Sequence, residues 1–261
     1  MNWHDLTSTE LASRVSERTV AVMALGAVEQ HGPHLPLDTD TRIAEGLLSA
    51  ALSRIDPGLD VLALPTQAIG ASDEHASFAG TLTLDARGFA DALESIGAGV
   101  ARAGVRRLVW VNGHGGNRAA MDIAALALRR RFGMLVVKCS YPRLGLPDGV
   151  DGPNDLARGF HGGWLETALM RHLAPERVRG DALADFAARH IDGRSDALVS
   201  PEGAAPFGWL AEDLNAEGVI GNAAAATPQA GTRLCAFYAA VIARVIEETA
   251  SLDRSSFGAR A

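Results

Sequence analysis

Short, uninterrupted apolar runs alternate with longer helix-forming stretches through the first 140 residues of the chain. Continuous apolar runs of this length are typical of strands that are buried on both faces of a sheet. They cover residues 19–25, 60–64, 106–111 and 134–140, and the helices predicted around them cover residues 41–55, 85–103 and 118–132. The alternation predicts βαβ units with right-handed crossovers, and therefore an α/β fold with a mainly parallel sheet.

The second half of the chain is less regular. HGGWLETALMRHL (residues 161–173) predicts a helix start, and a long helix is predicted over residues 231–251, with weak periodicity between them. No internal repeat and no linker-like segment divides the chain, and 261 residues fit one large α/β domain. We therefore expect a single domain over residues 1–261.

Charge and composition exclude several classes of partner. The formal net charge is −7 and the isoelectric point is near 5.6, which disfavours nucleic acid and anionic membranes as partners. No apolar run reaches the ~18 residues that a membrane span needs, and the first residues show no secretory signal pattern. The two cysteines, Cys139 and Cys235, lie far apart and imply no disulfide framework. We expect a cytoplasmic protein.

Ligand-type side chains follow the predicted strands. EQHGPHLPLDTD (residues 29–40) follows the first strand, SDEH (72–75) the second and NGHGGN (112–117) the third, while HGGWLE (161–166) follows a Pro/Gly/Asp-rich loop. The carboxyl ends of parallel strands meet at one edge of a sheet, where α/β proteins form their sites. The sequence therefore predicts that these four segments share one rim.

The side chains on this rim suit divalent metal ions. The candidate ligands are two histidines and three carboxylates: Glu29, His31, Asp40, His114 and Glu166. Imidazole suits zinc, manganese or iron, and a carboxylate can bridge two ions. Two such ions can share a hydroxide as nucleophile and polarise a carbonyl, which is the help that an acyl-transfer hydrolase without a serine or cysteine nucleophile needs.

Simpler explanations exist for parts of this set. Asp40 stands just before a predicted helix, where a capping acid is common, and His114 could be a turn residue between glycines. His34, between two prolines, is expected to be structural or to support a ligand. NGHGGN lacks the GKS/T ending of a phosphate loop, so a nucleotide site is not expected.

Three segments together resemble the creatininase (creatinine amidohydrolase) family: LGAVEQHGPHLPLDTD, VNGHGGN and HGGWLET. The resemblance covers about residues 18–250. It implies a three-layer α/β/α sandwich with a mainly parallel central sheet and assembly as a homo-oligomer, often a hexamer. It also implies a centre of two divalent ions that hydrolyses carbon–nitrogen bonds other than ordinary peptides, especially cyclic amides and formamides.

The resemblance implies roles for the metal ligands. Glu29 and His114 would bind one ion, His31 the other, and Asp40 would bridge the two. Creatininase itself has a glutamate two residues after the NGH histidine, where this chain has Gly116. In members with NGHGGN the acid comes from the segment after the catalytic histidine, so Glu166 is the expected fifth ligand.

Further roles follow from the same resemblance. His161 matches the catalytic histidine, which would carry a proton to the leaving nitrogen or hold the tetrahedral intermediate. Ser72 lies in the loop that meets substrate, and Glu74 and His75 of that loop could instead support the ligands. Trp164 is expected to pack within its helix.

The substrate is less constrained than the centre. Creatininase closes over its ring substrate with tryptophans before the catalytic histidine, whereas DGPNDLARGF (residues 151–160) has none. We therefore expect a metal-dependent amidohydrolase that acts on a small non-peptide amide through a metal-bound hydroxide. The alternatives are creatininase proper, a lactonase or short-peptide peptidase on the same dinuclear centre, and a non-enzymatic protein that retains the fold.

Overall fold

Strand β1 (Val20–Leu25) has no exposed residue because a helical layer covers each face of the sheet to which it belongs. Val20, Val22 and Ala24 point into one hydrophobic core, and the residues between them point into the other. This alternation explains why the strand reads as an unbroken apolar run. The computed structural model describes residues 1–150, 152, 161–187, 198–201 and 204–257.

The main sheet contains four parallel strands. Its order is β2-β1-β3-β4, with β2 at Val61–Ala63, β3 at Arg107–Asn112 and β4 at Leu135–Ser140. Each of the four predicted strands is present within a few residues of its expected bounds. The prediction of an α/β fold with a parallel sheet is therefore confirmed.

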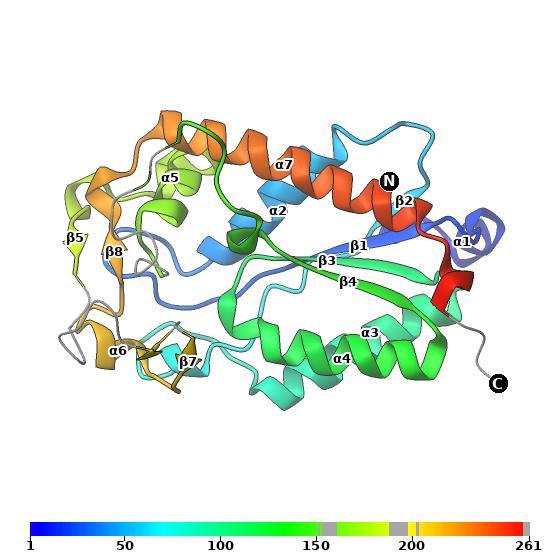
Figure 1. The fold of residues 1–261 in the computed structure, drawn as a ribbon, viewed down its shortest axis with the longest axis horizontal. Coiled ribbons are helices and arrows are strands. Elements are labelled where there is room, and N and C mark those ends of the chain that lie inside the picture. The colour runs from blue at the N-terminus through cyan, green and yellow to red at the C-terminus, as the bar shows by residue number, and fades with distance from the viewer. Residues whose placement is uncertain (151, 153–160, 188–197, 202–203, 258–261) are drawn as a thin grey trace.

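Helices lie on both faces of this sheet, as Figure 1 shows. One layer contains α2 (Thr39–Leu52), α5 (Trp164–Leu173) and α7 (Pro228–Ser251), which pack against one another. The other contains α3 (Ala86–Arg102) and α4 (Arg118–Phe132). The three-layer α/β/α sandwich is confirmed.

Local signals explain several helix ends. The Asp85 side chain accepts hydrogen bonds from the backbone N–H groups of Arg87 and Gly88, both at 2.9 Å, and so caps α3 as predicted. Helix α4 ends at Gly133, whose φ of +63° favours glycine. Helix α2 begins two residues earlier than predicted, with Asp38 at its N-cap position. Asp40 therefore lies in the first turn, and its interpretation as a helix cap is wrong.

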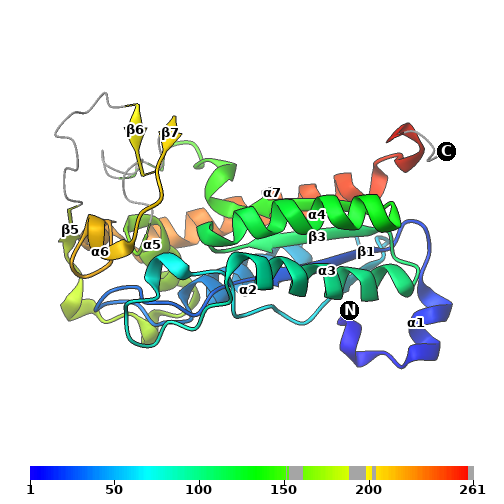
Figure 2. The same cartoon turned by 90° about the horizontal axis from the view of Figure 1, so that it is seen from below.

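Smaller elements gather at the carboxyl end of the sheet, away from the two termini (Figures 1 and 2). They are β5 (Asp185–Phe186), β6 (Val199–Ser200), β7 (Ala205–Pro206), α6 (Ala211–Leu214) and β8 (Gly221–Asn222), while α1 (Ser8–Arg14) precedes β1 at the opposite end. Residues 153–160, which contain most of the loop before His161, lie outside the described residues.

Helix α7 contacts α2 and α5 and also reaches strands β1, β3 and β4. Because the C-terminal helix packs on the strands of the N-terminal half, we propose that residues 1–261 form a single domain. Among the helices that the structure describes, none is long and apolar enough to cross a membrane.

The α7 layer generates a stability prediction. Ile242 of α7 is fully buried in the core under this layer, so Ile242→Ala should lower the free energy of unfolding by about 3 kcal/mol. Ile123 of α4 is 53% exposed, and Ile123→Ala should change it by less than about 0.5 kcal/mol. Urea unfolding of both variants checks this, and equal effects would contradict the assigned packing.

Candidate metal centre

The predicted metal ligands converge in a buried cluster beyond the carboxyl end of β1. Glu29 follows that strand, and its backbone N–H donates to the carbonyl of Leu37 at 2.9 Å. This bond folds the proline-containing loop back and brings Asp40, in the first turn of α2, beside Glu29. Neither carboxylate is more than 1% exposed.

The first group of donor atoms comprises Glu29, Asp40 and His114. His114 Nδ1 lies 3.2 Å from Glu29 Oε1 and 3.2 Å from Asp40 Oδ2. His114 follows β3, the neighbour of β1, so the parallel sheet itself brings the imidazole to the two carboxylates. The donor atoms lie within 4.8 Å of one another, which suits one ion.

The second group comprises His31, Asp40 and Glu166. His31 Nε2 lies 3.6 Å from Asp40 Oδ1 and 3.8 Å from Glu166 Oε2. Asp40 belongs to both groups, and its two oxygens face different histidines. This is the arrangement that a carboxylate bridging two ions requires.

Buried atoms without hydrogen bonds support a metal in this place. Within the described residues, both carboxylate oxygens of Glu29, Asp40 Oδ2 and His31 Nε2 are shielded from solvent and have no hydrogen-bond partner. Unsatisfied buried groups are costly, whereas a divalent cation would satisfy oxygen and imidazole donors together. The donor set therefore fits two divalent ions.

The charges in the cluster depend on one another. Against the effect of burial, the Asp40 carboxylate raises the pKa of His31 to about 9, and Glu29 raises the pKa of His114 well above its ordinary value. Burial raises the pKa of Glu166 to about 7. Protonated side chains thus offset the charge of the buried carboxylates, as bound metal ions would. Metal binding should therefore release protons.

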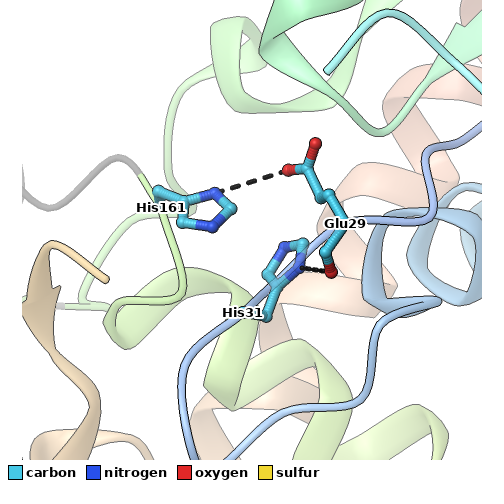
Figure 3. Close-up of side chains that lie close together, drawn as sticks. All are labelled: Glu29, His31 and His161. Carbon is cyan, nitrogen blue, oxygen red and sulfur yellow. Dashed lines mark hydrogen bonds and ion pairs between the residues drawn. The ribbon is translucent and has the colours of Figure 1, made fainter. Parts of the chain in front are cut away.

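His161 lies beside the Glu29 carboxylate (Figure 3). Its Nε2–H donates to the Gln30 carbonyl at 2.8 Å, which leaves the Nδ1 lone pair 3.5 Å from Glu29 Oε1. Burial, followed by repulsion from His75, holds the pKa of His161 well below its usual range. His161 could also join Glu29 and His31 as a third group of ligands, so geometry alone permits either a ligand or a proton carrier.

Gln30 is a site residue that the sequence analysis missed. Its side-chain amide donates to His75 Nδ1 at 2.9 Å and to the Gly218 carbonyl at 2.7 Å. His75 then carries its proton on Nε2, 3.6 Å from Glu29 Oε1. His75 therefore lies beside Glu29, and its role as a residue that supports the ligands stays a prediction. Only the position of Gln30 between two predicted ligands could have indicated its importance.

Three other expectations have clear structural outcomes. Nε2–H of His34 lies 2.9 Å from the Gly162 carbonyl and 3.0 Å from the Thr167 hydroxyl, so His34 is structural, as expected. Trp164 packs into the core, also as expected. Ser72 is fully buried with Oγ 3.4 Å from His114 Nε2, and its role in substrate binding stays a prediction.

A hollow of about 340 Å³ opens over the cluster. His114, His161 and Glu166 line this hollow, and Phe207 and Trp209 contribute aromatic surface to it. Its volume is at the lower end of the range for small-molecule sites. The arrangement is a buried donor cluster beneath a hollow large enough for a small organic molecule.

The family model described as creatinine amidohydrolase matches residues 4–246. Among curated proteins, a mycofactocin precursor peptide peptidase of Mycolicibacterium smegmatis is 32% identical over 88% of this chain and 84% of its own. A namesake from Mycobacterium ulcerans is 38% identical, and the match spans 62% of each chain. A creatinine amidohydrolase of Pseudomonas putida is 30% identical over 69% of this chain and 75% of its own.

Solved structures that superpose on this chain include proteins described as creatininases. A putative creatinine amidohydrolase of Bacteroides fragilis superposes with a TM-score of 0.78 at 22% identity, covering 97% of both chains, and supports the fold alone. A manganese creatininase and a Zn-Zn type creatininase mutant each superpose with a TM-score of 0.70 at 26% identity. Both cover 94% of this chain, with 97% and 96% of their own.

Close packing surrounds Gly116, where creatininase itself is expected to have a glutamate. A Cβ at Gly116 would lie 2.3 Å from the Ala71 carbonyl oxygen, 2.5 Å from His114 Nε2 and 2.6 Å from Glu74 Oε1. The Glu74 carboxylate thus occupies the space beside His114, and no side chain fits at position 116. This packing leaves no room for an acid at position 116, and Glu166 as the fifth ligand stays a prediction.

The same packing predicts the effect of a methyl group. Gly116→Ala should displace His114 and weaken zinc binding about 10-fold to 100-fold, as is typical when the support of a ligand is disturbed. Gly115→Ala is the matched control, because a Cβ there meets no atom within 4 Å. Competition with a chromophoric chelator measures both, and unchanged affinity in Gly116→Ala would contradict the close approach.

Proposed function

This chain belongs to the creatininase (creatinine amidohydrolase) family, and we propose that it hydrolyses a carbon–nitrogen bond of a small non-peptide amide at a centre of two divalent ions. The observation that carries the proposal is the pair of donor groups that share Asp40. The family match supports the hydrolytic chemistry, and the unsatisfied buried atoms support the metal centre.

The five ligand residues would divide between the ions. Glu29 and His114 would hold one, His31 and Glu166 the other, and Asp40 would contact both. When bound, such an ion pair acidifies a water molecule and polarises the amide carbonyl. Zinc and manganese are the favoured identities, since solved relatives are described with these metals, and iron is compatible with the same donors.

His161 would transfer a proton during the reaction. Its Nε2–H is engaged by the Gln30 carbonyl, so only Nδ1, which faces Glu29, is available to accept a proton and pass it to the leaving nitrogen. The hydrogen bond to Gln30 would keep the ring in this orientation. We also propose that the protein is cytoplasmic and assembles as a homo-oligomer, a hexamer by family resemblance.

A short-peptide peptidase is the second candidate. The observation that favours it is sequence similarity, because the relatives named mycofactocin precursor peptide peptidase are 32–39% identical, compared with 30% for the Pseudomonas putida creatinine amidohydrolase. The same centre would serve both reactions, so the substrate panel below includes peptides.

A substrate panel tests the proposal. Purified, metal-replete protein should release ammonia or an amine from one class among creatinine, formamides, cyclic ureides, lactams and short peptides. A strong chelator should abolish the reaction, and added zinc or manganese should restore it, because the proposed reaction depends on ions held by both donor groups. Turnover that survives complete metal removal would contradict the proposal, and turnover confined to peptides would select the second candidate.

His161→Ala tests the proton carrier separately. The variant should lose activity by about 100-fold or more while it still binds two metal ions, since the proposed ligand set does not include His161. His4→Ala is the control because His4 is an exposed histidine near the N-terminus that is not a candidate ligand. Loss of a metal ion from His161→Ala would instead assign the residue as a ligand.

A further inference from the structure

Two arginines line the hollow above the candidate metal centre, and neither is a ligand of the proposed ions. Arg118 opens α4, and its Nε–H donates to the Gly115 carbonyl at 3.1 Å, which holds the side chain next to the His114 segment. Arg143 lies in the turn Tyr141–Leu144 after β4 and is exposed. Among the described residues it makes no hydrogen bond and no ion pair, so its guanidinium is available to a ligand.

A second hollow of about 270 Å³ adjoins the first. The two share Arg118, Ser140 and Arg143 on their walls. The acid of the second hollow, Asp122, is paired with Lys138. Two guanidinium groups therefore lie on the wall that the two hollows share, in a chain whose net charge is −7.

Ser140 adds a neutral donor to the arginines. The Asn112 side-chain amide donates to the Ser140 hydroxyl oxygen at 3.1 Å and to the His114 carbonyl at 2.6 Å. Because the hydroxyl oxygen already accepts this bond, its hydrogen is left to donate into the hollow. Asn112 thus ties the position of Ser140 to that of a proposed metal ligand.

The rest of the first hollow differs in character. Phe207 and Trp209, from the segment between β7 and α6, contribute apolar surface, and the Trp209 ring meets His75 edge-on with centroids 6.3 Å apart. A molecule in this hollow would therefore meet a metal centre, an aromatic surface and a cluster of cationic and hydroxyl donors. Each of these three surfaces would bind a chemically different part of a substrate.

We propose that Arg118, Ser140 and Arg143 form a subsite for an anionic group, a carboxylate or a phosphate, on the substrate. Guanidinium groups bind these anions through paired, charge-assisted hydrogen bonds. The inference rests on the proposed function, because it names the substrate class of the same centre: a small amide that carries an apolar part and an anion. The anion would orient the amide over the ions without taking part in bond cleavage.

Calorimetric titration of the metal-loaded protein tests the subsite with probes that contain no amide. The probes are 3-phenylpropionate, phenyl phosphate and the neutral 3-phenyl-1-propanol. At least one anion should bind about 10-fold tighter than the alcohol, as expected for hydrogen bonds to charged groups. The anion that binds tighter identifies the substrate group as a carboxylate or a phosphate.

Variants separate the subsite from the metal ions, which could also attract an anion. Arg143→Gln should remove most of the preference for the anion, whereas Arg143→Lys should retain part of it. Arg130→Gln, which removes the same charge from the exposed face of α4, should keep the wild-type preference. Equal binding of the anions and the alcohol, or an anion preference unchanged in Arg143→Gln, would overturn the subsite. Because no probe can be hydrolysed, these outcomes are independent of the substrate panel that tests the proposed function.

Discussion

Two carboxylates without access to water, Glu29 and Asp40, are the constraint on which the rest of the site depends. Burying an ionised carboxylate costs several kcal/mol unless cations and hydrogen bonds compensate it. Each surrounding segment supplies a group that can do so: His114 from the end of β3, and His75 from the loop after β2. The order of strands in the sheet brings these segments together, so the fold and the proposed chemistry share one requirement.

Much of the fold was predictable because its signals are local. Helix α4 matches its predicted range, Asp85 caps α3, and the buried strands appear as apolar runs. The convergence of the three polar segments that follow strands came from one topological rule, that parallel strands end at the same edge. The start of α2 was misplaced by two residues because TDT reads equally well as the end of a loop.

Other features depend on contacts between distant segments. Gln30 reaches Gly218, and the obstruction at Gly116 comes from Ala71 and Glu74; neither contact leaves a periodic pattern in the sequence. The two-residue strands β5 to β8 are too short to show any alternation. The sequence therefore predicts well which candidate ligands lie together, and it predicts the walls of the hollow poorly. Phe207 and Trp209 come from one of these irregular segments, and their contribution to the hollow emerged only from the structure.

The most direct test of the central claim is anomalous X-ray diffraction from metal-replete crystals, measured on both sides of the zinc or manganese absorption edge. The account predicts two anomalous peaks per chain, both in contact with Asp40, one beside Glu29 and His114 and the other beside His31 and Glu166. A single peak held by Glu29, His31 and His161, or the absence of any peak in the cluster, would contradict it.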